Sequence, residues 1–326
     1  MNKHKWLWAL AWIVATYILY LCFREIKWGE ALREIKNASI FWLLMACLFN
    51  IFILCFWARQ WKAFLPQKYD VPFWRMFELN ALMSMTMNTV PFLAGHAFGV
   101  VMLAKREKVG HAIALSVLAL DQIAEAMAKF TLFSIVALLT PIPDIMRKGI
   151  GGVLLLLSLF FLVLMFFAFR HRDHQEPHED EILNVKERVL LFISRWAHHL
   201  EPMRNVKGFS FGVVMAWAMK LMEGLGIWAV QKAFGLDLSI WTVCVVLAAV
   251  NLATMFPVAP GNLGIYEAAV FFIYKYIGLS PELAMGLAIL QHLCYLLPKI
   301  ALGYGILLMR NFYPLAARRE PLTEET

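Results

Sequence analysis

The sequence predicts an all-α fold, a polytopic integral membrane bundle of about seven to nine transmembrane segments. Of its 326 residues, 61% are hydrophobic and only 16% are charged, and the mean hydropathy is +0.65. A soluble globular chain is closer to half apolar and a quarter charged. The apolar runs occupy nearly the whole chain, and most are long enough for a helix to cross a bilayer.

The same observations exclude several other classes. The longest charged stretch, residues 170–208, is too short to bury a core of its own, which excludes a folded catalytic domain outside the membrane. Long helical apolar runs also exclude an outer-membrane barrel, a coiled coil and a disordered chain. The net charge of +7 comes from basic residues scattered between spans, so no nucleic-acid partner is expected. The cysteines lie in apolar segments without metal-ligand spacing, and we expect no metal and no cofactor.

Apolar runs bounded by charged or turn-forming residues define the expected spans. They cover residues 6–23, 38–57, 111–139, 149–169, 209–231, 239–256, 265–277 and 283–309. Residues 24–37 mix apolar and charged positions, as an interfacial helix does. Trp57, Trp61 and Trp74 are expected to anchor the chain at a membrane interface. We treat residues 1–310 as one membrane domain and residues 311–326 as a polar tail.

The distribution of Lys and Arg predicts the orientation. If segment 76–103 dips into the membrane and returns, one side carries 19 basic residues and the other 7. If the segment crosses, the split is 17 against 9. Cytoplasmic loops are richer in Lys and Arg, which favours the re-entrant arrangement. Both arrangements place the 170–208 loop and the C-terminus in the cytoplasm of a bacterial-type inner (plasma) membrane.

Two apolar stretches, near residues 80–100 and 255–268, predict interrupted or re-entrant helices. The second contains Pro257, Gly261, Asn262 and Gly264 and is followed by Glu267. Prolines and glycines so close together cannot continue a helix. A broken backbone at membrane depth is tolerated only where protein or a wet cavity surrounds it. The alternative is an ordinary loop in which Glu267 merely complements the helix dipole.

The first stretch repeats this pattern. Pro91 and Gly95 are four residues apart, as Pro257 and Gly261 are, and each glycine is followed by a polar residue, His96 in the first stretch. Asn88 precedes Pro91. In transporters, interrupted segments in both halves of a chain mark a binding site at a repeat interface. Chance is the competing explanation for so short a match.

Charged residues also occur within the expected spans. Asp121, Glu125 and Lys129 follow one another at four-residue spacing on one helical face, with Glu125 in the favourable order to pair with Lys129. A charge at that depth costs at least ~2.5 kcal/mol, so these side chains must face the bundle interior or water. They indicate either an acidic site for a cation, proton or amine, or an internal ion pair.

Further ionisable residues lie within spans, Lys220, Glu223, His292 and Lys299 among them. Lys220 and Glu223 form a second pair of matched charges, whose simplest interpretation is structural. His292 in the last span is either a hydrogen-bonded structural residue or a proton carrier. We predict ion-pairing or coupling roles for Lys129, Lys220, Glu223 and His292. The predicted substrate-contacting residues are Asn88, Pro91, His96, Asp121, Glu125, Pro257, Gly261, Asn262, Gly264 and Glu267.

The motifs in the C-terminal third resemble those of the flippase-like transmembrane region of lysylphosphatidylglycerol synthases. They read Pro260-Gly261-Asn262-Leu-Gly264-Ile-Tyr266-Glu267 and Gly278-Leu-Ser280-Pro281-Glu282. Asn88, Pro91 and Gly95 match the family's earlier motif, but His96 stands at its acidic position and Gly99 at its arginine position. Gln122 and Tyr266 also stand where members carry arginine. The chain resembles a stand-alone member without the soluble aminoacyl-transfer domain.

The resemblance implies a non-enzymatic transporter, of flippase or scramblase type, that moves a membrane lipid or polyprenyl-linked lipid between leaflets. The missing arginines argue against a doubly charged phosphate headgroup and leave room for a lipid whose amine could meet Asp121 and Glu125. One alternative is an intramembrane transferase that uses a polyprenyl-linked donor, with Glu267 as its base. Another is an accessory membrane protein that binds an enzyme of lipid or envelope synthesis. A homo-oligomer is also compatible with the sequence.

Overall fold

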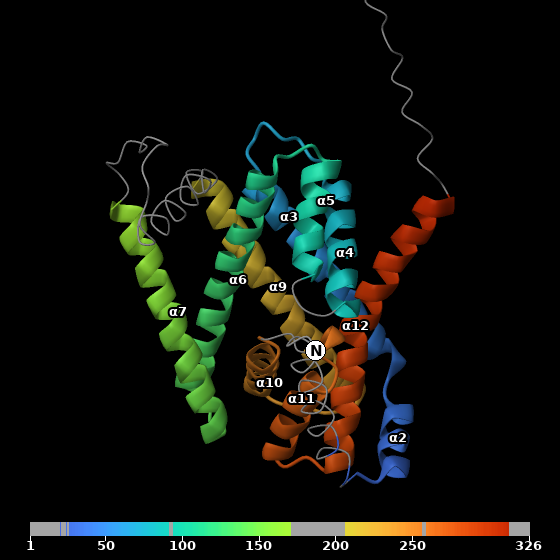
Figure 1. The fold of residues 1–326 in the computed structure, drawn as a ribbon. Coiled ribbons are helices and arrows are strands. Elements are labelled where there is room, and N and C mark those ends of the chain that lie inside the picture. The colour runs from blue at the N-terminus through green and yellow to red at the C-terminus, as the bar shows by residue number, and fades with distance from the viewer. Residues whose placement is uncertain are drawn as a thin grey trace, which may run out of the picture.

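The computed structural model describes residues 26–90, 94–170, 206–255 and 259–312, together with Tyr20 and Arg24. These residues form helices and connecting turns (Figure 1). The helices are α2 (Trp28–Asn37), α3 (Ile40–Phe64), α4 (Phe73–Thr89), α5 (Ala94–Arg106), α6 (His111–Leu139), α7 (Asp144–Arg170), α9 (Val206–Ala233), α10 (Ile240–Ala253), the 3₁₀ turn η2 (Pro260–Asn262), α11 (Ile265–Tyr276) and α12 (Pro281–Phe312). The expected span 6–23, most of the 170–208 loop and most of the tail lie outside the described residues.

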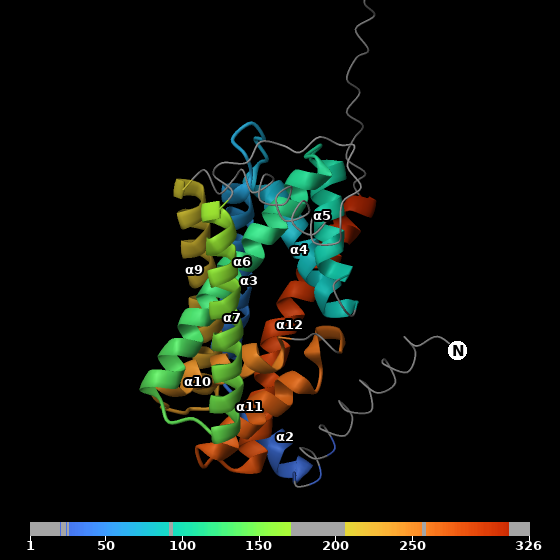
Figure 2. The ribbon, with the colours of Figure 1, turned by 60° about the vertical axis from the view of Figure 1, so that its left-hand side comes forward.

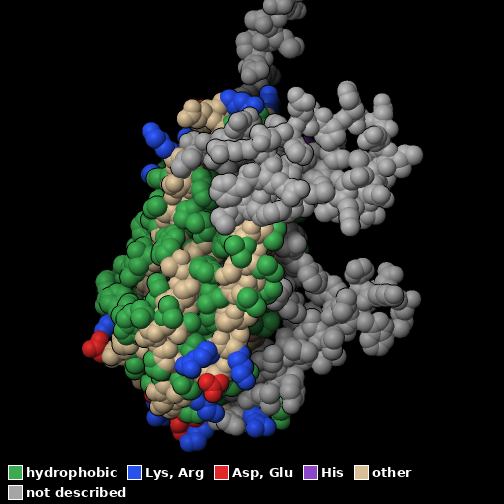
Figure 3. Space-filling view, turned by 90° about the vertical axis from the view of Figure 1, so that its left-hand side faces the viewer, with side chains coloured by type: hydrophobic (Ala, Val, Ile, Leu, Met, Phe, Trp, Pro, Cys, Tyr) green, Lys and Arg blue, Asp and Glu red, His purple; other side chains and the backbone are tan. Residues whose placement is uncertain are grey.

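Helices α3, α6, α7, α9 and α12 are each long and apolar enough to cross a membrane. Apolar side chains cover the middle of the molecular face in Figure 3, and the charged side chains described there gather toward its two ends. This distribution is that of a protein surrounded by lipid at its waist. The all-helical, polytopic membrane fold expected from the sequence is therefore confirmed.

Helices α4 and α5 form a hairpin of half-length helices. Helix α4 begins after Pro72, and its C-cap, Val90, is extended, as residues that precede a proline usually are. The two helices pack closely, because a Cβ added at Gly95 or Gly99 would overlap the side chain of Met87 or Met83, respectively. Both helices stay in the upper half of the molecule (Figures 1 and 2). Segment 76–103 therefore dips in and returns rather than crossing.

Helices α10 and α11 form the corresponding hairpin in the lower half (Figures 1 and 2). The prediction of separate spans at residues 239–256 and 265–277 is therefore wrong, because helices of 14 and 12 residues are too short to cross a bilayer. Its tip contains η2, where Gly261 and Asn262 have φ angles of +58° and +55°. The tips of the two hairpins meet, since a Cβ at Gly261 would lie 3.1 Å from the backbone carbonyl oxygen of Asn88. The Gly-Pro interruptions that the sequence places in opposite halves thus come together in the middle of the fold, although Pro91 and Pro257 themselves lie outside the described residues.

The packing of the first half is repeated in the second half. Helix α3 packs on α4, α6 and α12, and its counterpart α9 packs on α10, α12 and α6. Helix α5 packs on α4 and α6, as α11 packs on α10 and α12. Helices α3 and α9 run side by side down the centre and form the most extensive helix contact. Because one hairpin occupies the upper half and the other the lower half, the two halves are inverted relative to each other (Figure 1).

The connections divide between the two ends as the re-entrant arrangement requires. The α3–α4 turn, the α5–α6 turn, the last turn of α7, the first turn of α9 and the end of α12 lie at the upper end of Figure 1. Helix α2, the α6–α7 turn and the α9–α10 turn lie at the lower end. In the described part of the chain, the upper end includes residues 58–75 and 104–110, which carry seven Lys and Arg residues.

Labelling of single cysteines tests this topology. In a background without native cysteines, we expect cysteines at positions 68 and 108 to be protected together from a membrane-impermeant maleimide in intact cells. A cysteine at position 148 should react, because this position follows the α6–α7 turn, which lies at the opposite end of the molecule. Opposite accessibility at positions 68 and 108 would mean that segment 76–103 crosses the membrane.

Candidate functional site

A cavity of about 340 Å³ lies at the centre of the fold, where the two halves meet. Its walls come from α3, α4, α5, α6, α9, α10, α11 and α12 and from the tip at η2. Its charged lining residues are Asp121, Glu125, Lys129, Lys220, Glu223 and Lys299. Glu125 and Lys220 are each near the middle of their own spans, so the charges lie deep within the membrane region. Such residues in spanning helices commonly mark a substrate or ion path.

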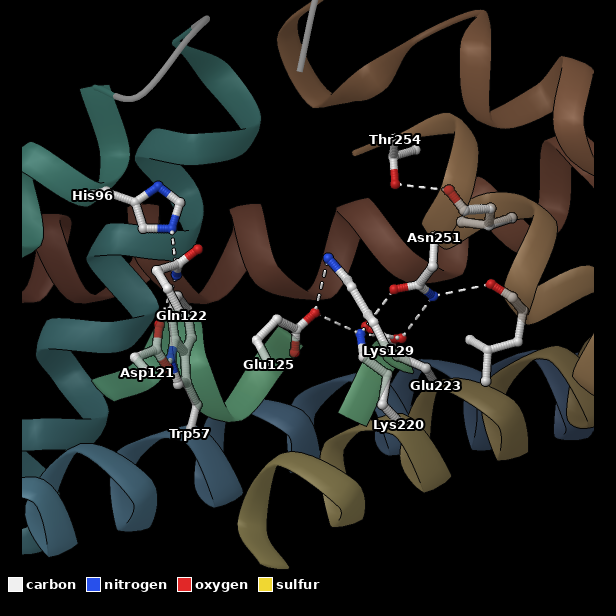
Figure 4. Close-up of polar contacts among 12 residues, drawn as sticks. Trp57, His96, Asp121, Gln122, Glu125, Lys129, Lys220, Glu223, Asn251 and Thr254 are labelled. Atoms are coloured by element: carbon white, nitrogen blue, oxygen red, sulfur yellow. Dashed lines mark hydrogen bonds and ion pairs between the residues drawn. The ribbon is translucent and has the colours of Figure 1, made fainter. Parts of the chain in front are cut away.

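Lys220 is the centre of a charged network that joins three helices (Figure 4). Its ammonium lies 2.8 Å from Glu125 of α6 and 3.0 Å from Glu223 of α9. It also donates to the side-chain oxygen of Asn251 on α10, at 3.0 Å. Lys129 lies 3.1 Å from Glu125, which is the pairing that the helical spacing predicts. The sequence spacing predicts a separate Lys220–Glu223 pair, whereas in the structure Lys220 also pairs with Glu125.

Asp121 is buried and accepts two hydrogen bonds. Trp57 donates to one carboxylate oxygen at 2.8 Å, and Gln122 donates to the other at 3.1 Å. The Gln122 amide nitrogen also lies 3.5 Å from Nε2 of His96, which projects from α5 toward it in Figure 4. The interpretation of Trp57 and Trp61 as interface anchors is wrong: Trp57 lines the cavity and Trp61 is fully buried in the core. Only Trp74 of the three is strongly exposed.

The tip of the second hairpin is held by hydrogen bonds outside the cavity wall. Glu267 accepts from the backbone N–H of Gly264 at 2.7 Å and approaches His292 at 2.7 Å. The other ring nitrogen of His292 lies 2.9 Å from the carbonyl oxygen of Gly261. Two acceptors therefore face the two ring nitrogens, and both contacts form when one proton lies on Nε2 and another is shared with Glu267. The His292 ring also stacks on Tyr266, with centroids 4.2 Å apart.

The structure thus separates the predicted site residues into two groups. Those that line the cavity are Asn88, His96, Asp121, Glu125, Lys129, Lys220, Glu223 and Asn262. Gly261, Gly264, Glu267 and His292 build the hairpin tip behind the wall. A direct substrate contact by this second group stays a prediction. Pro91 and Pro257 lie outside the described residues.

The sequence reasoning left several cavity residues out of the candidate site. Lys299 on α12 is 4% exposed, and its ammonium lies 3.3 Å from the centroid of the Tyr295 ring. Gln291 is also buried and donates to the hydroxyl of Tyr266 at 3.0 Å. The sequence signal for Lys299 is a charged residue within the apolar span 283–309.

A comparison with protein-family models matches residues 7–303 to the lysylphosphatidylglycerol synthase TM region. The chain belongs to this family. It is also 22% identical over 313 residues to a "UPF0104 membrane protein" of Methanothermobacter thermautotrophicus, covering 89% of this chain and 91% of that relative. The family assignment and the spanning helices establish a multi-pass membrane protein.

Three of the four positions at which the resemblance implies a departure from the family motif, His96, Gln122 and Tyr266, line the cavity. Gly99 instead packs between α5 and α4, where a Cβ would meet the side chain of Met83. This chain therefore differs from the motif in side chains that line the cavity. Its two hairpins are nevertheless formed.

Substitution of Lys220 tests the charged network. We expect Lys220→Met to destabilise the fold by about 3–5 kcal/mol, because two buried carboxylates lose their shared cation. Lys232→Met is the matched control, since Lys232 pairs with Asp237, whose side chain is 94% exposed, and such pairs contribute about 0–1 kcal/mol. Thermal unfolding in detergent measures both. Equal melting temperatures for the two variants would contradict the central role of Lys220.

Substitution of Glu267 tests the structural role of the hairpin tip. We expect Glu267→Ala to cost about 1–3 kcal/mol, because the Gly264 N–H and the His292 ring lose their acceptor. Glu282→Ala removes another first-turn glutamate, at the start of α12, and should change stability by no more than about 0.5 kcal/mol. The same melting experiment compares them. Equal melting temperatures for Glu267→Ala and Glu282→Ala would show that Glu267 does not stabilise the tip.

Proposed function

We propose that the protein moves a membrane lipid between leaflets by passing its headgroup through the central cavity while the acyl chains remain in lipid. The observation that carries this proposal is a charged cavity at mid-span depth, between hairpins that enter from opposite ends. A headgroup that crosses a bilayer unaided must leave water, and a polar path within the protein removes most of that cost.

The inverted halves support the same function. In transporters built from inverted repeats, the substrate site lies at the repeat interface, beside broken helices whose ends face the substrate. Here the hairpin tips meet at the cavity, and each contributes lining residues, Asn88 and His96 from the first and Asn262 from the second. We place this protein in a bacterial-type inner membrane, with its basic end in the cytoplasm.

The transferase alternative has less support. Its expected base, Glu267, is engaged by the Gly264 N–H and His292 and does not line the cavity. A general base must come within hydrogen-bonding distance of the proton that it removes. If the protein instead only binds an enzyme of lipid synthesis, substitutions of the cavity residues should leave its function unchanged.

Reconstitution tests the transport function. We expect vesicles that contain the protein to expose acyl-labelled fluorescent lipids of both leaflets to dithionite, whereas protein-free vesicles expose only the outer leaflet. Glu125→Gln should slow exchange by about tenfold or more, equivalent to ~1.4 kcal/mol in the barrier, because Lys129 and Lys220 lose a buried counter-charge.

Glu30→Gln is the matched control for this measurement. Glu30 also pairs with a lysine, Lys27, but on the exposed surface of α2, and its loss should leave the exchange rate unchanged. Exchange no faster than in protein-free vesicles, or equal rates for Glu125→Gln and the wild type, would contradict the proposal.

A further inference from the structure

The three carboxylates that line the described part of the cavity differ in their partners. Glu125 and Glu223 each form ion pairs with lysines. Asp121 forms no ion pair within the described chain, and its two oxygens accept from neutral groups, the Trp57 indole and the Gln122 amide. Neutral donors reduce the cost of a buried charge but do not cancel the charge. An ionised Asp121 is therefore a net negative charge within a membrane span.

The surroundings of Asp121 favour a proton over a metal cation. Asp121 is 4% exposed, so its oxygens have little open space beside them. A hard metal cation takes about six oxygen ligands or more, whereas the groups that face these oxygens are N–H donors. In the described chain, no three His, Cys, Asp or Glu side chains are grouped to hold a metal ion. A proton needs a single lone pair, and each carboxylate oxygen has a second one beside its hydrogen bond.

Gln122 connects Asp121 to the first hairpin. Its amide nitrogen donates to Asp121 at 3.1 Å and lies 3.5 Å from Nε2 of His96 on α5 (Figure 4). The amide carries two hydrogens, so one can reach each partner when Nε2 of His96 is an acceptor. Gln122 is exposed and lines the cavity, so water in the cavity reaches this corner. A proton on the oxygen that faces Gln122 replaces an acceptor with a donor and so weakens the link to α5.

The other ionisable groups around the cavity set the charge that Asp121 modifies. The described lining also contains Glu125 and Lys129 of α6, His96 of α5, Lys220 and Glu223 of α9, Tyr266 of α11, and Cys294, Tyr295 and Lys299 of α12. The described lining residues of α3, α4 and α10 carry no ionisable side chain. Three lysines thus stand against three carboxylates, and uptake of one proton by Asp121 changes their formal sum from zero to one positive charge.

We propose that Asp121 is the proton-binding residue of the transport cycle and that a proton gradient drives the movement of the lipid. This inference rests on the proposed function of the cavity as a lipid path and names its coupling ion. A hydronium ion in the cavity gives one proton to a carboxylate oxygen of Asp121 and becomes water, and the carboxylate loses its charge. Gln122 is a positioning residue, because its contact joins the charge state of Asp121 to the α4–α5 hairpin.

Infrared difference spectroscopy tests proton binding without any transported lipid. When the pH is lowered from about 8 to about 6, exposed Asp and Glu side chains stay ionised. We expect the C=O stretch of a protonated carboxylic acid to appear in the wild type, to be absent from Asp121→Asn and to return at a changed frequency in Asp121→Glu. Asp237→Asn is the matched control, because the side chain of Asp237 is 94% exposed, and it should keep the band.

The infrared result has two outcomes that would overturn the assignment. One is a wild-type protein that shows no such band. The other is a band that persists in an Asp121→Asn protein with the melting temperature of the wild type, because the proton would then be on another carboxylate.

Vesicles with an imposed pH difference test the coupling. Valinomycin and equal potassium on both sides hold the electrical potential at zero, and albumin extraction measures how much of a short-chain fluorescent lipid is in the outer leaflet. If one proton moves with each lipid, a difference of one pH unit should change the leaflet ratio by up to about tenfold, and a reversed gradient should reverse the asymmetry. Asp121→Asn should show no asymmetry. Asymmetry that follows a sodium gradient at equal pH would contradict a proton as the coupling ion.

Gln122→Leu separates proton binding from its coupling to lipid movement. This variant keeps the carboxyl group of Asp121 but loses the bridge to His96, so the infrared band should remain and the lipid asymmetry should be lost. Gln67→Leu is the matched control, because Gln67 is exposed in the α3–α4 turn, and it should retain both. Wild-type asymmetry in Gln122→Leu would show that Gln122 does not couple the two events.

The two assays distinguish this inference from the proposed function. An Asp121 band without lipid exchange in vesicles would support the proton site and reject lipid transport. Lipid exchange that is unaffected by every pH gradient would support transport and reject proton coupling, whether or not the band is present.

Discussion

A helix that ends halfway through a membrane must find partners for its open backbone groups within the protein, because lipid offers none. Both hairpins of this fold obey that constraint at the same place. At the second tip, Glu267 receives the Gly264 N–H, and His292 contacts both Glu267 and the Gly261 carbonyl. At the first tip, the Asn88 side chain donates to the carbonyl of Ser84 one turn earlier. The two tips meet, and residues of both line the central cavity.

The opening left at the centre determines where charge is tolerated. Charged side chains on spanning helices are stable only when they face one another or water. Lys220 connects α6, α9 and α10 through Glu125, Glu223 and Asn251, so the network also fixes the separation of helices from both halves. The ion pairs of Glu125 and Glu223 leave a cavity that is polar rather than strongly charged. Two lining residues of the described chain lie outside these pairs: Asp121 accepts from the neutral side chains of Trp57 and Gln122, and the Lys299 ammonium lies against the Tyr295 ring.

The sequence specified the architecture more fully than the site. Hydropathy located the long spans, and the two Pro-Gly interruptions located the hairpins, because both signals are local in the chain. Hydropathy alone could not tell the two arms of the α10–α11 hairpin from separate spans, because both arms are predominantly apolar. Charge counting also favoured re-entry of segment 76–103. The partners of Lys220 and Asp121 depend on which helix faces which, and no local pattern contains that information. Trp57 illustrates the limit, since an indole near a helix end predicts an interfacial anchor until its distance to Asp121 is known.

Helix α7 contributes no residue to the cavity wall among its described side chains, and it presents Leu155, Leu156 and Leu159 to the surroundings. Its importance lies in the number of membrane crossings that it adds between the two halves. Each half of the fold crosses the membrane twice and turns back once, so each half begins and ends at the same end of the molecule. A direct connection between α6 and α9 would join two halves of the same orientation. One additional crossing makes the second half start at the opposite end of the molecule. Helix α7 is that crossing, and its contribution to the fold is the crossing itself rather than any side-chain contact with the cavity.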